Sequence, residues 1–343
     1  MDKEFTTPKS MKKVIPRAIR TTLLQLESAT KVEISQHLDI SFPTVSKVIA
    51  QMEKEGEVYE VGLDDSSGGR RAQRYTYNPD YMLGLALFLE EDKTVYTIFN
   101  CVGEVKEKGT EVVMVQDDLD SLTELIKKTI LTFPKISSIA IGVPGAVDNG
   151  RIFYIPNYEG FHEFDLKDYY EDLFSIPVVV ENDMNAAVLG FHIMNKRVEN
   201  QSLVYVYSGK NGPGAGILIN GDVVRGSTFF TGEISFVPLY DDRNLLQALE
   251  QRDKKSMEKI RMSRELEIQA LGRLIASFVA IINPHEIIFS KEEMNEITLD
   301  RVAIETAQYV PKEHLPRLVL SNWKEDYLNG LQHLALDRMI TNN

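Results

Sequence analysis

Small polar and basic side chains gather between residues 41 and 47, in a segment with the spacing of a helix. They are Ser41, Thr44, Ser46 and Lys47, and Pro43 stands among them in the first turn, where its missing N–H is no loss. Hydroxyl and ammonium groups can hydrogen-bond phosphate oxygens and base edges, and these side chains are too small to hold a helix out of the major groove. The pattern predicts contact with double-stranded DNA.

Three helices and a hairpin are expected to position this tip. An apolar stripe indicates a first helix before residue 27, and its members are Ile15, Ile19, Leu23 and Leu26. Thr30 and Glu33 have capping-box spacing at the start of a second helix over 31–38, whose apolar face is Val32, Ile34 and Leu38. A third helix over 42–56 has Ser41 as a candidate N-cap. Its apolar positions are Val45, Val48, Ile49 and Met52. Two short helices joined by a tight turn form a helix-turn-helix, whose second helix enters the major groove.

A hairpin follows the third helix. Residues 57–62 alternate as a strand, 63–69 have the composition of a loop, and 70–79 return as a second strand. Arg70 and Arg71 at the base of this hairpin suit contact with phosphates or a narrow minor groove. Residues 1–78 are therefore interpreted as a winged helix-turn-helix DNA-binding domain.

The charge distribution agrees with this division of the chain. The 343 residues carry a formal net charge of −13, but residues 1–78 hold 12 basic and 11 acidic side chains. The rest of the chain holds 26 basic and 40 acidic side chains. An acidic body repels nucleic acid and confines DNA contact to the N-terminal surface.

Several classes of protein are disfavoured by composition. The single cysteine, Cys101, allows neither a disulfide within the chain nor a cysteine cluster for zinc. No apolar run approaches the roughly 20 residues of a membrane span, and the first residues show no signal-peptide core. We expect a cytoplasmic protein without membrane contact.

From residue 81 onwards, predicted strands alternate with helices, which indicates an α/β body. Strands are expected at 82–89, 93–100, 104–115, 137–145, 178–183, 202–208 and 285–290, and helices at 119–131, 185–194 and 264–282. Ligands usually bind in the loops that follow such strands.

Motifs spread along the body carry a family resemblance. They are GVPGAVDNG at 142–150, IPNYEGF at 155–161, ENDMNAA at 181–187, NGPGAGILINGDVVRG at 211–226, GEISF at 232–236 and LGRLIASFVAIINPHEIIF at 271–289. The body resembles the ROK family of sugar kinases and sugar-responsive repressors, and the wing resembles the segment that joins the two parts in ROK repressors. The resemblance implies an actin-like ATPase fold over 79–343. Its lobes would span about 79–180 and 181–325, with a C-terminal helix returning to the first lobe.

The resemblance also implies a sugar site between the lobes. It assigns ligand contact to Asn157, Asn182, Asp183 and Glu233, with backbone contact at Gly145. A carboxylate beside an amide can read neighbouring hydroxyl groups. The alternative is that Asn182 and Asp183 only cap the helix that follows them.

Three departures from the family pattern argue against catalysis. The turn that would approach ATP phosphates reads LEEDKT at 89–94, with Glu90, Glu91 and Asp92 in place of glycine and backbone donors. Ser290, Lys291 and Glu292 replace a frequent Gly-Gly pair near the nucleotide. Phe236 stands where zinc-bearing relatives have a histidine, and no cysteine follows it in the loop, so no metal or other cofactor is expected.

The glycine-rich segment 209–216 could cradle a phosphate or serve as a hairpin turn, and the second alternative is favoured. Phe236 is expected to make the sugar pocket more apolar, which leaves open an unusual sugar, a sugar phosphate or no effector.

The leading hypothesis is a transcription regulator, a repressor of carbohydrate-related genes, that binds a DNA operator as a homodimer or tetramer in response to a sugar or sugar-phosphate effector. One alternative is an active sugar kinase with a DNA-binding appendage. Another is a sensor of a protein partner.

Overall fold

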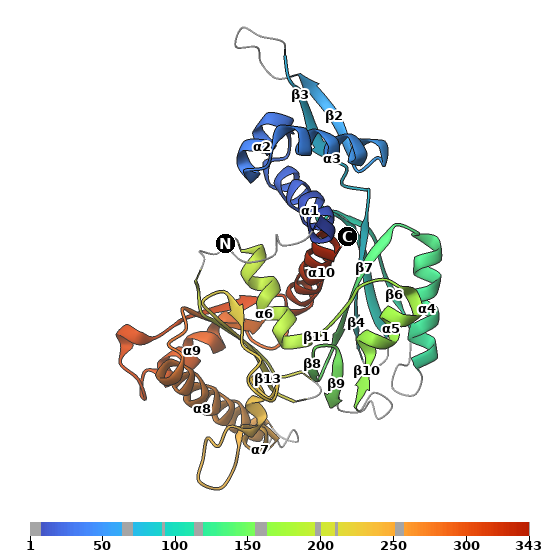
Figure 1. The fold of residues 1–343 in the computed structure, drawn as a ribbon. Coiled ribbons are helices and arrows are strands. Elements are labelled where there is room, and N and C mark those ends of the chain that lie inside the picture. The colour runs from blue at the N-terminus through green and yellow to red at the C-terminus, as the bar shows by residue number, and fades with distance from the viewer. Residues whose placement is uncertain are drawn as a thin grey trace.

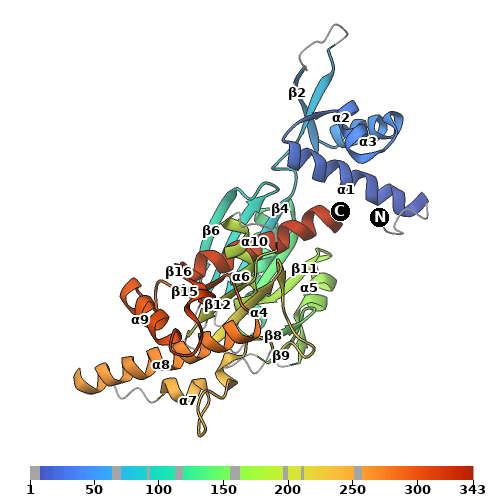
Figure 2. The same ribbon diagram turned by 90° about the vertical axis from the view of Figure 1, so that its left-hand side faces the viewer.

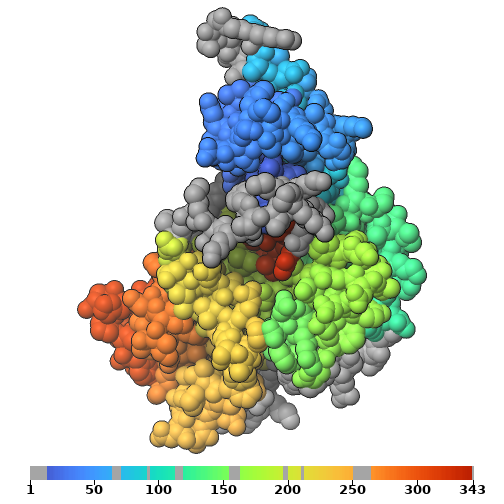
Figure 3. All heavy atoms as spheres, viewed as in Figure 1, coloured from blue at the N-terminus to red at the C-terminus, as the bar shows by residue number. Residues whose placement is uncertain are grey.

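The computed structural model in Figure 1 describes residues 8–63, 71–90, 93–112, 119–154, 163–195, 200–209, 212–250 and 257–342. Four residues singled out above lie outside these ranges, namely Arg70, Glu91, Asp92 and Asn157. Figure 3 shows an N-terminal module standing above a body whose two lobes lie side by side.

The N-terminal module is a winged helix-turn-helix, as predicted. Its helices are α1 (Pro8–Leu26), α2 (Lys31–Leu38) and α3 (Phe42–Lys54), and its strands are β1 (Ala29–Thr30), β2 (Val58–Leu63) and β3 (Gln73–Tyr77). The strands pair antiparallel in the order β1-β3-β2. The β2–β3 hairpin is the wing, and it projects away from the body (Figure 1).

Local sequence signals explain most of this module. The Thr30 hydroxyl accepts from the Glu33 N–H and the Glu33 carboxylate accepts from the Thr30 N–H, so the predicted capping box is confirmed. Asp39 then takes a left-handed conformation, with a φ of 53°, and turns the chain towards α3.

Two apolar positions of the sequence interpretation are wrong in this module, and the predicted N-cap of α3 holds by position only. The side chains of Leu26 and Val32 are 45% and 47% exposed, because the helix faces that carry them point away from the small core. Ser41 occupies the N-cap position, but its side chain makes no capping hydrogen bond. Its hydroxyl instead pairs with that of Thr44 at 2.8 Å.

The first lobe is built on a five-stranded sheet in the order β11-β7-β4-β5-β6. The strands are β4 (Leu83–Leu89), β5 (Thr94–Asn100), β6 (Val105–Glu111), β7 (Ile136–Val143) and β11 (Val178–Asn182). Helices α4 (Leu119–Thr132) and α5 (Leu166–Phe174) pack on one face. A small antiparallel sheet lies beside it and consists of β8 (Ala146–Asp148), β9 (Arg151–Tyr154) and β10 (Phe164–Asp165).

The second lobe is built on a sheet in the order β14-β13-β12-β15-β16. The strands are β12 (Leu203–Tyr207), β13 (Gly214–Ile219), β14 (Asp222–Val223), β15 (Glu286–Ser290) and β16 (Arg317–Ser321). Its outer face is covered by helices α7 (Leu245–Glu250), α8 (Met257–Ile281) and α9 (Glu296–Thr306), and short 3-10 turns lie at Ile234–Phe236 and Lys312–His314. The predicted helix over 264–282 therefore begins about two turns earlier, at Met257.

Two helices lie between the sheets, α6 (Asp183–Met194) and α10 (Trp323–Asn342). Their side chains share one hydrophobic cluster with the inner faces of both sheets. They cross at glycines. A Cβ on Gly190 would lie 1.9 Å from the Asp326 carbonyl oxygen, and one on Gly330 would lie 1.9 Å from the Ala186 carbonyl oxygen. Backbone therefore contacts backbone at the centre of the body.

The close crossing of α6 and α10 predicts that a glycine to alanine change there lowers stability, which is the opposite of its usual effect in a helix. Gly330→Ala should lower the free energy of unfolding by about 1–3 kcal/mol, because the new methyl group would force two backbones apart. A glycine to alanine change in an unhindered helix instead stabilises by about 1 kcal/mol. The comparison variant is Gly272→Ala in α8, whose new Cβ would meet the Glu305 Cγ and Cβ at 2.5 and 3.0 Å, and it should cost less because a side chain can shift more easily than two backbones. Chemical denaturation that finds Gly330→Ala as stable as the parent would contradict the close crossing.

Candidate functional site

The start of α3 presents the predicted DNA-contact residues at the surface. Ser41, Pro43 and Lys47 are exposed, while Thr44 and Ser46 are half-buried. Among the ion pairs that the described ranges contain, none uses Lys47. The tip of α3 thus keeps hydroxyl groups and an ammonium group available to a polyanion.

The wing carries a second basic surface. Arg71 is exposed at its base, and Arg70 falls outside the described residues. Sequence reasoning missed Arg74, which donates to the Ser28 carbonyl oxygen at 2.9 Å and pairs with Glu33 at 3.2 Å. These contacts hold the wing against the start of α2, so Arg74 fixes the angle at which the wing leaves the module.

Sequence reasoning also passed over Phe42, the first residue of α3. Its side chain is 48% exposed. Its spacing from Val45 is that of the buried stripe, so periodicity alone would place it in the core. An exposed aromatic ring at this end of a recognition helix can pack on a thymine methyl group.

Four of the predicted ligand residues line one cavity between the lobes. Gly145, Asn182, Asp183 and Glu233 surround a volume of about 100 Å³. The β7–β8 turn, the start of α6 and loops of the second lobe meet there. The fifth, Asn157, lies outside the described residues. The fold therefore brings together residues that are widely separated in the sequence.

Asn182 holds the start of α6 in place. Its Oδ1 accepts from the backbone N–H groups of Met184 and Asn185 at 2.9 and 3.0 Å. Its Nδ2 donates to the Gly145 carbonyl oxygen at 3.0 Å. The amide oxygen is thus occupied by capping, and the amide nitrogen joins α6 to the β7–β8 turn that forms the opposite wall of the cavity.

Asp183 and Glu233 are the acidic groups of the cavity. Burial, together with the nearby Glu233 charge, raises the pKa of Asp183 to about 7 against the opposing hydrogen bond from the Met184 N–H. Burial also raises the pKa of Glu233. Two carboxyl groups that resist ionisation together suit an uncharged ligand with hydroxyl groups better than an anion.

Phe236 does not make this cavity more apolar, contrary to the expectation from sequence. Its side chain is 61% exposed and packs against Phe230, with ring centroids 5.3 Å apart. Ser235 lines the cavity in its place, and its hydroxyl donates to the Pro213 carbonyl oxygen at 2.7 Å. The 3-10 turn at Ile234–Phe236 rotates Phe236 outwards.

Glu90 stands in the segment that the family resemblance assigns to nucleotide phosphates, and it is held by contacts within the chain. Its N–H donates to the Lys93 carbonyl oxygen at 2.8 Å. The Glu90 carboxylate pairs with Lys93 at 3.1 Å and with Lys324 of α10 at 2.9 Å. The Glu90 carboxylate thus has two lysine partners.

A second carboxylate contacts the residue that precedes the glycine-rich segment. Both oxygens of Glu293 accept from the Ser208 N–H, at 3.1 and 2.9 Å. This segment connects the antiparallel strands β12 and β13, so its interpretation as a hairpin turn is confirmed. Beside it, Tyr207 stacks on Trp323 with centroids 4.2 Å apart and planes 8° from parallel.

The described residues contain neither a metal-binding cluster nor a helix that could span a membrane. No group of three or more His, Cys, Asp or Glu side chains there is arranged to hold a metal ion. No helix within the same ranges has the length and apolar character needed to cross a bilayer.

Comparison with known proteins relates part of this chain to a family. Residues 92–244 match the model of the ROK family. A solved structure described as a ROK family transcriptional regulator, homologue of E. coli MLC protein, superposes with a TM-score of 0.73 over 97% of this chain and 100% of the other, at 18% identity. A ROK family glucokinase from Streptomyces griseus, in complex with glucose and AMPPNP, superposes with a TM-score of 0.58 over 74% of this chain and 99% of that chain, at 18% identity.

The predicted fold class, a winged helix-turn-helix followed by a two-lobed actin-like ATPase fold, is confirmed by the ROK regulator, and the kinase matches the body alone.

Curated relatives of similar sequence are repressors. A xylose repressor of Caldicellulosiruptor bescii is 29% identical over 234 residues, which is 65% of this chain and 58% of the repressor. The DNA-binding transcriptional dual regulator NagC of Escherichia coli is 23% identical over 238 residues, or 66% and 58% of the two chains. The chain thus spans about three fifths of the length of the relatives it matches.

The raised pKa of Asp183 predicts how stability depends on pH. Between about pH 4 and 7 the folded chain keeps a proton on Asp183 that the unfolded chain releases, so this group lowers stability as pH rises through that window. We therefore compare the free energy of unfolding of Asp183→Asn with that of the parent. The variant should gain up to a few kcal/mol relative to the parent between pH 4 and pH 7, and this difference should stay constant above about pH 8.

Thermal or chemical denaturation between pH 4 and 9 measures this difference. Asp300→Asn, at an exposed position on α9, controls for the loss of one charge. A stability difference for Asp183→Asn that is the same at every pH would contradict the raised pKa.

Proposed function

We propose that this protein is a DNA-binding transcription regulator of carbohydrate-related genes, acting as a repressor, whose interlobe cavity takes a sugar-type effector. The observation that carries the proposal is the joining of a winged helix-turn-helix, with exposed polar residues at its tip, to a ROK body whose cavity holds buried carboxyl groups. The names of the relatives support the same combination.

The proposed DNA contacts are at the start of α3 and in the wing. The major groove would receive the polar tip of α3, which consists of Ser41, Pro43, Thr44, Ser46 and Lys47. Phe42 would add an apolar contact there. Arg70 and Arg71 would contact phosphates or the minor groove.

Paired recognition helices need a dimer, so the proposal includes a homodimer or tetramer on a pseudo-palindromic operator, in the cytoplasm.

The proposed effector is an uncharged sugar or a close derivative. Asp183 and Glu233 supply hydroxyl-binding groups whose raised pKa values disfavour two charges in one cavity. Gly145 offers backbone groups, and Asn157 remains part of the proposed site. A phosphorylated sugar is less favoured, because no cation lines this cavity among the described residues.

The body is proposed to lack kinase activity. Glu90 stands in the segment that the family resemblance assigns to ATP phosphates, and Glu293 contacts Ser208 before the glycine-rich segment, so both carboxylates would repel a phosphate bound near them. One observation favours the alternative of an active sugar kinase, since a pKa of about 7 suits Asp183 to act as a general base. A coupled assay of ADP release with hexoses, xylose and amino sugars tests it, and turnover abolished by Asp183→Asn would establish the kinase.

The DNA-binding proposal predicts a difference between two lysines on the same helix. Lys47→Ala should weaken binding to a selected operator about 5- to 100-fold, because it removes a contact at the tip of α3. Lys54→Ala removes the same charge from the exposed far end of α3 and should change affinity less than about 2-fold. Operators are first selected from random DNA and affinities are then measured by fluorescence anisotropy at fixed salt. Failure to select any sequence, or equal losses for the two variants, would contradict the proposal.

The effector proposal predicts that sugars stabilise the chain. D-xylose or N-acetyl-D-glucosamine should raise the melting temperature at millimolar concentration by mass action, and Asp183→Asn should abolish the shift. L-arabinose serves as a control for nonspecific effects of sugars. If the chain binds DNA but shows no thermal or calorimetric response to any sugar, the proposal of a sugar effector is wrong. A protein partner then becomes the favoured effector.

A further inference from the structure

A buried ion pair lies inside the N-terminal module. The Arg20 Nε of α1 is 2.6 Å from the Glu57 Oε1, and the two residues are 4% and 3% exposed. Taking both charges out of water is costly, and a pair of apolar residues would often be as stable. Glu57 follows α3 directly, and its N–H donates to the Met52 carbonyl oxygen in the last turn of that helix. The ion pair therefore joins α1 to the end of the recognition helix.

The same guanidinium reaches the far end of the chain. A terminal nitrogen of Arg20 donates to the Ile340 carbonyl oxygen at 3.1 Å, in the last turn of α10. Carbonyl groups there lack helical partners and form the negative end of the helix dipole, so a cation satisfies them well. Met339 is fully buried in the core of the module. Figures 1 and 2 both show the C-terminal end of α10 beside α1.

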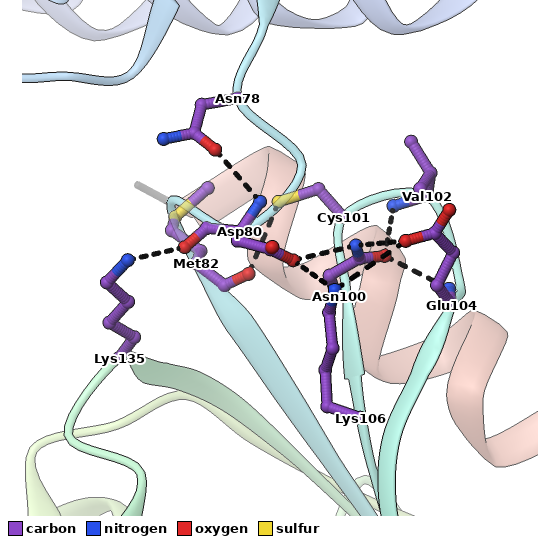
Figure 4. Close-up of polar contacts among 9 residues, drawn as sticks. All are labelled: Asn78, Asp80, Met82, Asn100, Cys101, Val102, Glu104, Lys106 and Lys135. Carbon is purple, nitrogen blue, oxygen red and sulfur yellow. Dashed lines mark hydrogen bonds and ion pairs between the residues drawn. The ribbon is translucent and has the colours of Figure 1, made fainter.

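The connecting segment after the wing is also held to the body (Figure 4). Its Asp80 carboxylate accepts from the Asn100 amide at 2.9 Å and pairs with Lys106 at 2.7 Å. Lys135 donates to the Asp80 carbonyl oxygen at 2.7 Å, and the Cys101 N–H donates to the Pro79 carbonyl oxygen. The module thus has two attachments, one through this segment and one through Arg20 to α10.

The other end of this path is the interlobe cavity. Helix α6 begins at Asn182 and Asp183 in the cavity wall, and it contacts α10 backbone to backbone at Gly190 and Gly330. Helices in such contact cannot slide past each other without breaking the packing of both, so a shift at the start of α6 must move α10.

We propose that Arg20 is a positioning residue that couples the α6–α10 pair to the recognition helix. A displacement at the cavity moves α10, the Ile340 carbonyl moves with it, and the Arg20–Glu57 pair passes the movement to the end of α3. The biological meaning of this coupling rests on the proposed function, because the recognition helix is then the output of the effector cavity.

Hydrogen exchange on the full chain tests the coupling without DNA or sugar. Above about pH 8, where Asp183 is ionised, Asp183→Asn removes the charge at the start of α6 and serves as the stimulus. We expect it to alter exchange at the end of α10, in α1 and in the last turn of α3, by at least about fivefold. In the Arg20→Lys background the response in α10 should remain, while the response in α1 and α3 should fall below about twofold. Lysine keeps the charge next to Glu57 but lacks the second donor arm that reaches Ile340.

Two further variants separate coupling from folding. Arg20→Met combined with Glu57→Met removes both buried charges together, so no unpaired charge is left to unfold the module, and it should also lose the response. Arg17→Met, at an exposed position one turn earlier on α1, should keep it. A response in α1 and α3 that survives in the Arg20 variants, or no response beyond α6 in the parent background, would overturn the proposal. Either result would contradict the coupling alone, because the proposed function is tested independently by operator selection and by sugar binding.

Discussion

The crossing of α6 and α10 is the contact on which the rest of the body depends. Two central sheets present apolar faces to each other, and only a pair of helices between them can cover both faces at once. The glycines at the crossing allow these helices to approach to backbone contact. As a result the layer of helices between the lobes is closely packed, and each helix has one end at another part of the molecule. Helix α6 starts at the cavity, and α10 ends in the core of the N-terminal module.

This arrangement explains why the module and the body are not independent units joined by a loose linker. The core of the winged helix-turn-helix continues past residue 78 to Met82, Cys101 and Met339. The connecting segment is fixed by hydrogen bonds and an ion pair on the body side. A regulator needs such a junction, because an effector can change DNA affinity only if the two sites share a structural element that both of them bias.

The same scaffold accounts for the proposed loss of phosphate chemistry. A kinase needs backbone donors that face bound phosphates from both lobes, whereas here Glu90 and Glu293 satisfy the chain's own cations and N–H groups. The Glu90–Lys324 pair joins the first lobe to the start of α10. The cavity that remains is small and holds weakly ionised carboxyl groups, a chemistry suited to hydroxyl groups.

Local patterns in the sequence determined the elements. The capping box at Thr30 and Glu33, the hairpin of the wing and the alternation of strands and helices depend on residues within a turn or two of each other, and they form as expected. The motifs of the ROK resemblance placed Asp183, Glu233 and Gly145 around one cavity. Only the tertiary structure decided that the amide oxygen of Asn182 caps α6, that Phe236 points outwards, and that Phe42 is exposed.

Arg20 shows the physical reason most clearly. On the sequence it is an ordinary basic residue of a helix, with nothing in its neighbours to mark it. Its burial depends on Glu57 and on the end of α10, more than 300 positions further along the chain. Contacts between such distant segments exist only once the whole chain has folded, and no local pattern encodes them.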